Sequence, residues 1–188
     1  MIKNFFSLVL ELLKVVVISL AIIIPIRYFL IQPFYVKGAS MEPNFHDHEY
    51  LIIDEISYRL NQPKRGDIVV FRYPRDPQEF YIKRIIGLPG EKVEIRDGKV
   101  IIYNQSEPDG FSLQEDYLPE GTRTDGGLGR EQIQLEDGEY FVLGDNRNSS
   151  KDSRSFGPVS KSFVTGKVLL RGWPLSKFDV FKTPEYQY

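Results

Sequence analysis

The chain has 188 residues, and its 24 lysines and arginines against 26 aspartates and glutamates give a formal net charge of −2. Such a chain lacks the general basic surface that binding to nucleic-acid phosphates requires. Because it has no cysteine and two histidines, disulfides, thiolate metal sites and a cysteine nucleophile are excluded, and a histidine-based zinc site would need several carboxylates. Its 41% apolar and 13% aromatic residues are typical of a folded domain.

The first predicted element is an apolar helix over about residues 5–26. A helix of that length spans about 33 Å, enough to cross the hydrocarbon core of a bilayer. No small-x-small cleavage site follows, so we interpret residues 1–31 as an uncleaved anchor, not as a removed signal peptide or a buried helix of a soluble protein. The flanking basic residues are nearly balanced, so charge leaves the orientation open. The apolar stretch 28–34 fits either the membrane surface or a first core strand.

Residues 32–188 alternate short β-rich runs with turn signals. Asp97-Gly98 is a strong two-residue hairpin signal. Many short strands with close turns predict a mainly β chain, with an all-β, partly closed barrel as its main domain. Residues 104–138 are poor in apolar side chains, and we expect a long surface insertion or a small β extension there. The strands are predicted at 34–37, 49–56, 67–72, 80–86, 91–95, 98–103, 139–143 and 163–171.

Three polar segments stand out against this β pattern, and the first is GASMEP at residues 38–43. Ser40 lies among small residues, which allow another chain to approach the backbone closely. Pro43 favours a turn directly after it. Taken alone, the segment fits either a nucleophilic serine or an ordinary loop serine.

The second segment is the strand YIKRIIG at residues 81–87. Alternation puts Lys83 on one face and Arg84 on the other, so a strand buried on one side would carry one of them inward. A lysine held against apolar surface has a lowered pKa, whereas an arginine stays charged. This favours Lys83 as a base and Arg84 as an ion-pair partner. The alternative is an edge-strand lysine that discourages aggregation.

The third segment, GDNRNSSKDSRSFG, covers residues 144–157. Its two Asp-x-Arg pairs predict a polar loop that satisfies its own charges, in which Asp145 pairs with Arg147 and Asp152 with Arg154. A solvated turn is the alternative.

Together the three segments supply a serine nucleophile and a base that is not histidine. A serine hydroxyl becomes nucleophilic when a neighbouring group takes its proton, and a Ser–Lys dyad is one way to achieve this. A Ser–His–Asp triad of Ser40, His46 and Asp47, or a metal site at His46 and His48, fits the composition only.

The order of five segments along the chain resembles that of the type I signal peptidases. These segments are the N-terminal anchor, GASMEP (38–43), RGDIVVFRYP (65–74), YIKRIIGLPGE (81–91) and GDNRNSSKDSRSFGPV (144–159). The resemblance covers most of the chain outside 104–138. It implies a membrane-bound serine endopeptidase that removes N-terminal signal peptides from exported pre-proteins. It also implies membrane lipid as a partner, no cofactor, metal or nucleic acid, and a single-pass chain with a cytoplasmic N-terminus and an extracytoplasmic catalytic domain.

By matched position, the resemblance makes Ser40 the nucleophile, Lys83 the general base and Ser150 the hydroxyl that orients the lysine. Some family members carry, at the position of Gly38, a serine that helps to form the oxyanion hole. The second oxyanion donor is therefore open between a water and another backbone amide. The resemblance makes Met41, Asp145, Arg147, Asp152 and Arg154 site-supporting, and we add Gly38 and Arg84 to this group.

We expect the substrate to bind in an extended form, as a strand added beside residues 34–38 or 80–83. Small side chains at the first and third positions before the cut are implied by the resemblance. The alternative is a membrane-anchored, non-catalytic β-module acting through residues 104–138, or an inactive paralogue. Self-cleaving repressors share a Ser/Lys β-fold, but they carry a helical DNA-binding domain that no segment of this sequence predicts.

Overall fold

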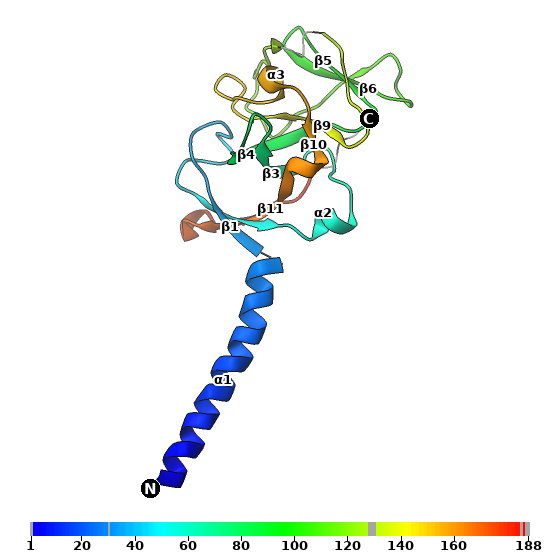
Figure 1. Ribbon diagram of the computed structural model, residues 1–188. Coiled ribbons are helices and arrows are strands. Elements are labelled where there is room, and N and C mark those ends of the chain that lie inside the picture. Colours follow the sequence, from blue (N-terminus) through cyan, green and yellow to red (C-terminus); the bar gives the residue numbers. More distant parts are fainter. Residues whose placement is uncertain (1, 30, 128–130, 185, 187–188) are drawn as a thin grey trace.

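A computed structural model describes residues 2–29, 31–127, 131–184 and 186. Its first element, helix α1 (Ile2–Phe29), projects away from a β-domain that holds the rest of the chain (Figure 1). The segment Ser7–Ile24 is long and apolar enough to cross a membrane, and none of it is buried inside the protein. An apolar surface of this size is stable in water only when something covers it, which a bilayer does.

The helix is longer at both ends than the predicted 5–26. Strand β1 (Ile31–Tyr35) begins almost directly after it and pairs with β2 (Tyr50–Asp54) from Ile31↔Asp54 to Tyr35↔Tyr50. The stretch 28–34 is therefore divided between the end of α1 and the first core strand, with residue 30 outside the described residues.

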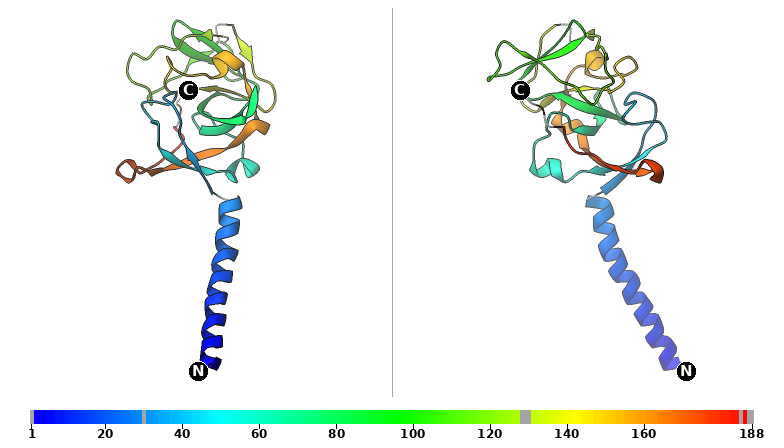
Figure 2. Two further views of the ribbon diagram at one scale, coloured as in Figure 1. Left: turned by 60° about the vertical axis from the view of Figure 1, so that its left-hand side comes forward. Right: turned by 180° about the vertical axis from the view of Figure 1, so that it is seen from behind.

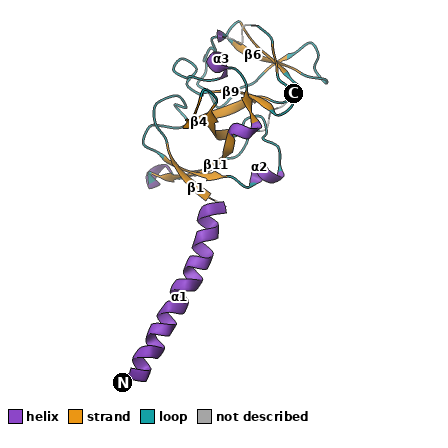
Figure 3. Cartoon of the chain, in the orientation of Figure 1, coloured by secondary structure: helices purple, strands orange, loops and turns teal. Residues whose placement is uncertain are grey.

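The β-domain contains two antiparallel sheets, which confirms the mainly β prediction (Figure 3). All eight predicted strands are present. The strand at 139–143 has the predicted bounds, and the other seven have shifted ends; the fourth, for example, begins at Asp76 instead of residue 80. The larger sheet has the order β1, β2, β11 (Val164–Trp173), β3 (Ile68–Tyr73), β4 (Asp76–Gly87), β9 (Glu139–Leu143) and β10 (Val159–Ser160), and β12 (Asp179–Val180) pairs with β11.

The smaller sheet has the order β7 (Phe111–Ser112), β6 (Lys99–Tyr103), β5 (Lys92–Arg96) and β8 (Ile133–Gln134). Asp97 and Gly98 both have positive φ, 56° and 83°, as the predicted hairpin turn between β5 and β6 requires. The remaining elements are short: α2 (Ser57–Leu60), α3 (Ser153–Phe156) and the 3₁₀ turns η2 (Lys161–Phe163) and η3 (Leu175–Lys177).

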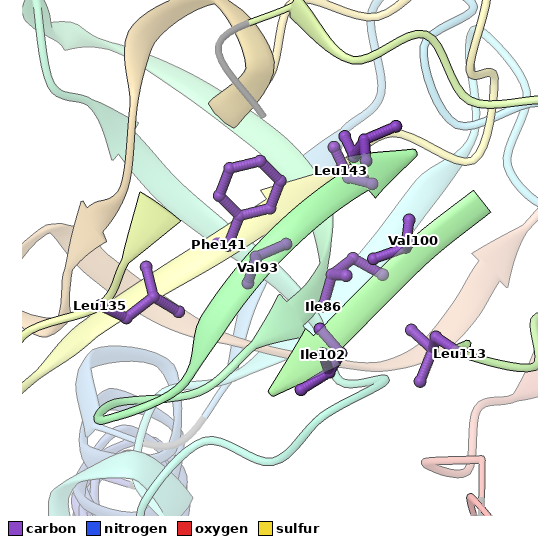
Figure 4. Close-up of a cluster of buried hydrophobic side chains, with 9 residues drawn as sticks. Ile86, Val93, Val100, Ile102, Leu113, Leu135, Phe141 and Leu143 are labelled. Atoms are coloured by element: carbon purple, nitrogen blue, oxygen red, sulfur yellow. The ribbon is translucent and has the colours of Figure 1, made fainter. Parts of the chain in front are cut away.

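Residues 104–138, expected to form a long surface insertion or a small β extension, include two short strands, and many of their described residues are exposed. The segment contributes β7 and β8 to the smaller sheet. Its Leu113 and Leu135 are 7% and 1% exposed, and they point into the same apolar cluster as Ile86 and Phe141 (Figure 4). These two buried leucines attach the segment to the apolar core, although its average composition is polar.

Candidate active site

Ser40 lies in the loop that joins β1 to β2. Two backbone bonds close the base of this loop: Val36 N–H donates to the Glu49 carbonyl over 2.9 Å, and His48 N–H donates to the Val36 carbonyl over 3.1 Å. Met41 and Phe45 are 1% and 0% exposed and pack in the core beneath the loop. Ser40 is therefore held in place by buried residues that follow it in the loop, and Met41 is one of them.

Lys83 reaches Ser40 from strand β4. Its Nζ lies 2.7 Å from Ser40 Oγ and 2.8 Å from the carbonyl oxygen of Ile82. The lysine is 3% exposed, and this burial lowers the pKa of its amine from 10.5 to about 8, although the carboxylates of Asp152 and Asp145 oppose the shift. At mildly alkaline pH a large fraction of the amine is neutral and able to accept a proton.

Arg84 lies on the opposite face of β4 and is also 3% exposed. The prediction that only one of the two cations points inward is wrong, because other parts of the chain cover both faces of the strand. The Arg84 guanidinium binds the Asp145 carboxylate through two bonds of 2.9 and 2.6 Å and lies 3.9 Å from the Tyr117 ring centre. Arg84 is thus an ion-pair partner, as expected.

The loop after β9 satisfies only part of its charge internally. Asp152 pairs with Arg154 at 2.8 Å, as predicted. Asp145 does not pair with Arg147, because its carboxylate is engaged by Arg84 from β4. Arg147 instead donates to the Glu115 carboxylate at 2.7 Å. Ion pairs with two residues that are distant in sequence, Arg84 and Glu115, therefore hold the loop in place.

Two asparagines and a glycine connect this loop to Ser40, and the sequence reasoning missed all three. Asn146 donates its backbone N–H to the Ser40 carbonyl over 3.1 Å and its Nδ2 to the Ala39 carbonyl over 3.0 Å. Asn44 Nδ2 donates to the Asp145 carboxylate over 2.8 Å. Gly144 allows close approach, since a Cβ there would lie 2.4 Å from the Ser40 carbonyl oxygen. In the sequence, the only indication that Asn146 and Gly144 belong to the site was their position in the polar segment at residues 144–157.

Ser150 lies near the Ser40 backbone, but its hydroxyl bonds to neither Ser40 nor Lys83. A Cβ on Gly144 would be 2.1 Å from Ser150 Oγ, which puts this hydroxyl close to the Ser40 backbone. The hydroxyl is buried and has no hydrogen-bond partner among the described residues. The expected bond between Ser150 and Lys83 is therefore absent from this structure. Its donor and acceptor capacity remains unused.

The backbone N–H groups near the Ser40 hydroxyl are candidate donors for an oxyanion. Gly38 N–H is already engaged, since it donates to Asp47 Oδ1 over 3.0 Å. Ser40 N–H donates to none of the described residues. The missing side chain at Gly38 leaves open space, because a Cβ there would meet no atom within 4 Å.

A cleft of about 520 Å³ opens in front of the pair, between β1 and the first half of β4. Both strands present free edges: β1 ends the sheet, and β9 pairs with β4 only from Arg84 onward. Phe34 and Phe80 meet across the cleft with ring centres 5.4 Å apart. Met41 is not among the lining residues, which are Phe34, Tyr35, Val36, Lys37, Ser40, Leu51, Val70, Glu79, Phe80, Tyr81, Ile82, Lys83 and Lys151.

The histidines form no alternative site with Ser40. His46 lies 3.6 Å from Glu42, and His48 lies 3.0 Å from Asp47, whose carboxylate also accepts from Gly38 N–H. The side-chain partner of Ser40 is Lys83, so the Ser–His–Asp arrangement is not formed. In the described part of the chain, no three histidine or carboxylate side chains are grouped so that they could hold a metal ion.

Comparison with known proteins gives a consistent result. Residues 9–173 match the family described as signal peptidase, peptidase S26. The chain is 38% identical over 174 residues to a probable signal peptidase I-2 from Synechocystis sp., covering 89% of this chain and 75% of the relative. It is 32% identical over 179 residues to signal peptidase IB of Staphylococcus aureus strain MRSA252, and the match covers 90% of this chain and 92% of that relative. A crystal structure of a signal peptidase I from Enterococcus faecalis V583 has 37% identity and a TM-score of 0.47, covering 57% of this chain and 97% of that one.

Proposed function

Because the chain belongs to the signal peptidase family, peptidase S26, it is a serine endopeptidase that cleaves signal peptides, and we propose that Ser40 and Lys83 perform the reaction. The observation that carries this proposal is the 2.7 Å separation of Lys83 Nζ and Ser40 Oγ, with the lysine buried and its pKa lowered to about 8. A neutral amine at this distance can take the serine proton.

In the proposed mechanism, neutral Lys83 accepts the Ser40 hydroxyl proton while Oγ attacks the scissile carbonyl carbon. The negative oxygen of the tetrahedral intermediate accepts a hydrogen bond from the free Ser40 N–H. The lysine ammonium then protonates the departing amine, which leaves an acyl-enzyme on Oγ. Lys83, neutral again, deprotonates a water that attacks the ester carbon, and the lysine ammonium then returns this proton to Ser40 Oγ as the carboxylic acid product is released. Lys83 thus moves each proton, and Ser40 makes the covalent bond.

The substrate segment binds in the cleft as an added strand. The free edges of β1 and of the first half of β4 support this, because an extended peptide can form backbone hydrogen bonds with an unpaired edge. Phe34 and Phe80 both line the cleft, and their ring centres lie 5.4 Å apart. Bulky aromatic side chains in the lining favour small substrate side chains before the cut, in agreement with the small-x-small sites that the family resemblance implies.

We also propose that the β-domain lies on the extracytoplasmic surface of the cell membrane, with the short N-terminus in the cytoplasm and α1 between them. Membrane lipid as a partner is supported by exposed aromatic side chains at the end of β1, where the loop that carries Ser40 begins. Tyr35, Tyr50 and Trp173 are neighbours on three adjacent strands and are 39%, 47% and 55% exposed. Aromatic side chains of this kind are enriched at membrane interfaces.

The proposal is tested with the full-length protein in detergent and a purified pre-protein that carries a signal peptide. We expect wild type to cut after the small-x-small site. Ser40→Ala and Lys83→Arg should each lower kcat/KM by at least about a thousandfold, since a guanidinium retains the charge but cannot act as a base. Ser106→Ala and Lys99→Arg, at exposed positions in the smaller-sheet region, are the matched controls.

Appreciable cleavage by folded Lys83→Arg would refute the assignment of the base. If folded wild type cut no substrate even with added lipid, the non-catalytic module would become the better interpretation.

A further inference from the structure

A second, smaller pocket lies on the β-domain beside α2 and η2. It holds about 290 Å³, and four of its lining side chains are charged: Arg59, Arg72, Lys161 and Glu55. Three cations against one carboxylate leave a net charge of +2 in a confined space. The pocket is separate from the Ser40–Lys83 cleft, and the two share no lining residue.

Strand pairing places this pocket next to the end of the membrane helix. Ile31, the first residue of β1, pairs with Asp54, and Glu55 of the pocket follows Asp54 directly. Only one residue separates Ile31 from Phe29, where α1 ends. Figures 1 and 2 both show α2 at the end of the β-domain that faces α1. The 28 residues of α1 extend about 42 Å, close to the full thickness of a bilayer with its headgroups. The pocket therefore lies at headgroup level if α1 spans the membrane.

The charged groups of the pocket are poorly satisfied by the protein itself. Neither the Arg59 nor the Arg72 guanidinium makes an ion pair or side-chain hydrogen bond with a described residue, and both residues are exposed. Lys161 Nζ has one neutral partner, Gln62 Oε1 at 2.9 Å. Glu55 Oε1 is buried and has no hydrogen-bond donor among the described residues. The pocket thus offers free donors for an anion and one buried acceptor that needs a donor.

We propose that this pocket binds the headgroup of an anionic phospholipid, namely phosphatidylglycerol, in the leaflet next to the β-domain. Its phosphate is held by Arg59, Arg72 and Lys161, because guanidinium groups bind phosphate oxygens with good geometry. A glycerol hydroxyl of the headgroup donates to Glu55 Oε1. The net charge of +2 favours an anionic lipid over zwitterionic phosphatidylethanolamine, and phosphatidylcholine has no donor for Glu55.

The test uses the full-length protein in a non-ionic detergent and counts bound lipids by native mass spectrometry. Phosphatidylglycerol, phosphatidylethanolamine, phosphatidylcholine and inorganic phosphate are titrated separately. We expect phosphatidylglycerol to bind most tightly and Arg59→Gln/Arg72→Gln to weaken it about tenfold, to the level of phosphatidylcholine. Lys92→Gln/Lys99→Gln removes the same charge from exposed sites in the smaller sheet and should leave binding unchanged. Equal thermal unfolding temperatures without lipid establish that the variants are folded.

Equal affinity of wild type for phosphatidylglycerol and phosphatidylcholine would overturn the proposal, as would a preference that survives in the arginine variant. Inorganic phosphate binding as tightly as phosphatidylglycerol would make the pocket a free-anion site instead. The inference rests on the proposed membrane attachment but not on catalysis. Ser40→Ala should bind lipid like wild type, so a failure here is distinguishable from a failure of the peptidase mechanism.

Discussion

At the scale of single residues, the central feature is a buried lysine with a lowered pKa, which we propose as the general base. Lys83 is 3% exposed, and the cost of holding a charge there lowers the pKa of its amine to about 8. The carboxylates of Asp152 and Asp145 act in the opposite direction, but each is bound to an arginine. Pairing those carboxylates with Arg154 and Arg84 limits their effect on the lysine.

This pKa predicts the pH dependence of the reaction. The active form is the neutral amine, so kcat/KM should rise with pH and level off above a midpoint near 8. Initial rates on a pre-protein between pH 6 and 10, with circular dichroism at each pH to monitor folding, would measure the midpoint. A flat profile from pH 7 to 9, or a midpoint at 10.5, would contradict Lys83 as the base.

Ser150 gives a second residue-scale prediction, because its buried hydroxyl has no partner. Removing such a group by Ser150→Ala should leave the free energy of unfolding unchanged or raise it by up to about 1 kcal/mol. If the hydroxyl positions Lys83 in the substrate complex, kcat should nevertheless fall at least about tenfold. Ser150→Thr keeps the hydroxyl and should restore part of kcat. Wild-type activity in Ser150→Ala would rule out a positioning role.

At the scale of elements, two loops and one strand form the site, and buried ion pairs join them. Strand β4 contributes Lys83 on one face and Arg84 on the other. Arg84 holds Asp145, and the neighbouring Asn146 donates to the Ser40 carbonyl. The region between β7 and β8 adds Glu115, which binds Arg147. The segment with the weakest β pattern thus stabilises the loop that positions the serine.

This connection predicts the effect of breaking the Arg84–Asp145 pair. Asp145→Asn leaves a buried guanidinium without its counter-charge and should lower the free energy of unfolding by about 3 kcal/mol. Chemical denaturation would measure this change. Asp116→Asn, at an exposed position, is the control and should change stability by less than about 0.5 kcal/mol. A loss below about 1 kcal/mol in Asp145→Asn would show that the pair does not hold the loop.

At the scale of the whole molecule, a membrane helix leads directly into an edge strand of the β-domain. β1 follows α1 after a single residue, and the loop with Ser40 begins at the other end of β1. The site is therefore about one strand length from the membrane end of the domain. A short connection of this kind would keep the proposed catalytic cleft near the membrane surface when α1 spans the bilayer.

The absence of cysteine allows a direct test of the proposed orientation. Single cysteines at Asn4 and at the exposed Gly121 are each introduced into the full chain in intact cells. A membrane-impermeant maleimide should label Gly121→Cys without lysis and Asn4→Cys only after lysis. The reverse pattern would refute the extracytoplasmic position of the β-domain.

The sequence by itself determined the anchor, the mainly β class and the identities of the central residues. These properties are local or ordered along the chain: a long apolar run, short strands between turn signals such as Asp97-Gly98, and motifs in a fixed order. Alternation also separated Lys83 from Arg84 on opposite faces of β4. For the same reason all eight predicted strands were found, one with the predicted bounds and the others with ends shifted by one to four residues.

Only the tertiary structure decided which groups meet. The Asp145–Arg147 pair looked favourable from spacing, yet Asp145 pairs with Arg84 and Arg147 with Glu115, from distant segments. Both cations of β4 are buried because sheets and loops cover both of its faces, which alternation within one strand does not reveal. The basic pocket likewise joins charges from α2, β3 and η2. Such contacts depend on how the sheets and loops pack against one another in space, and no local sequence pattern records that packing.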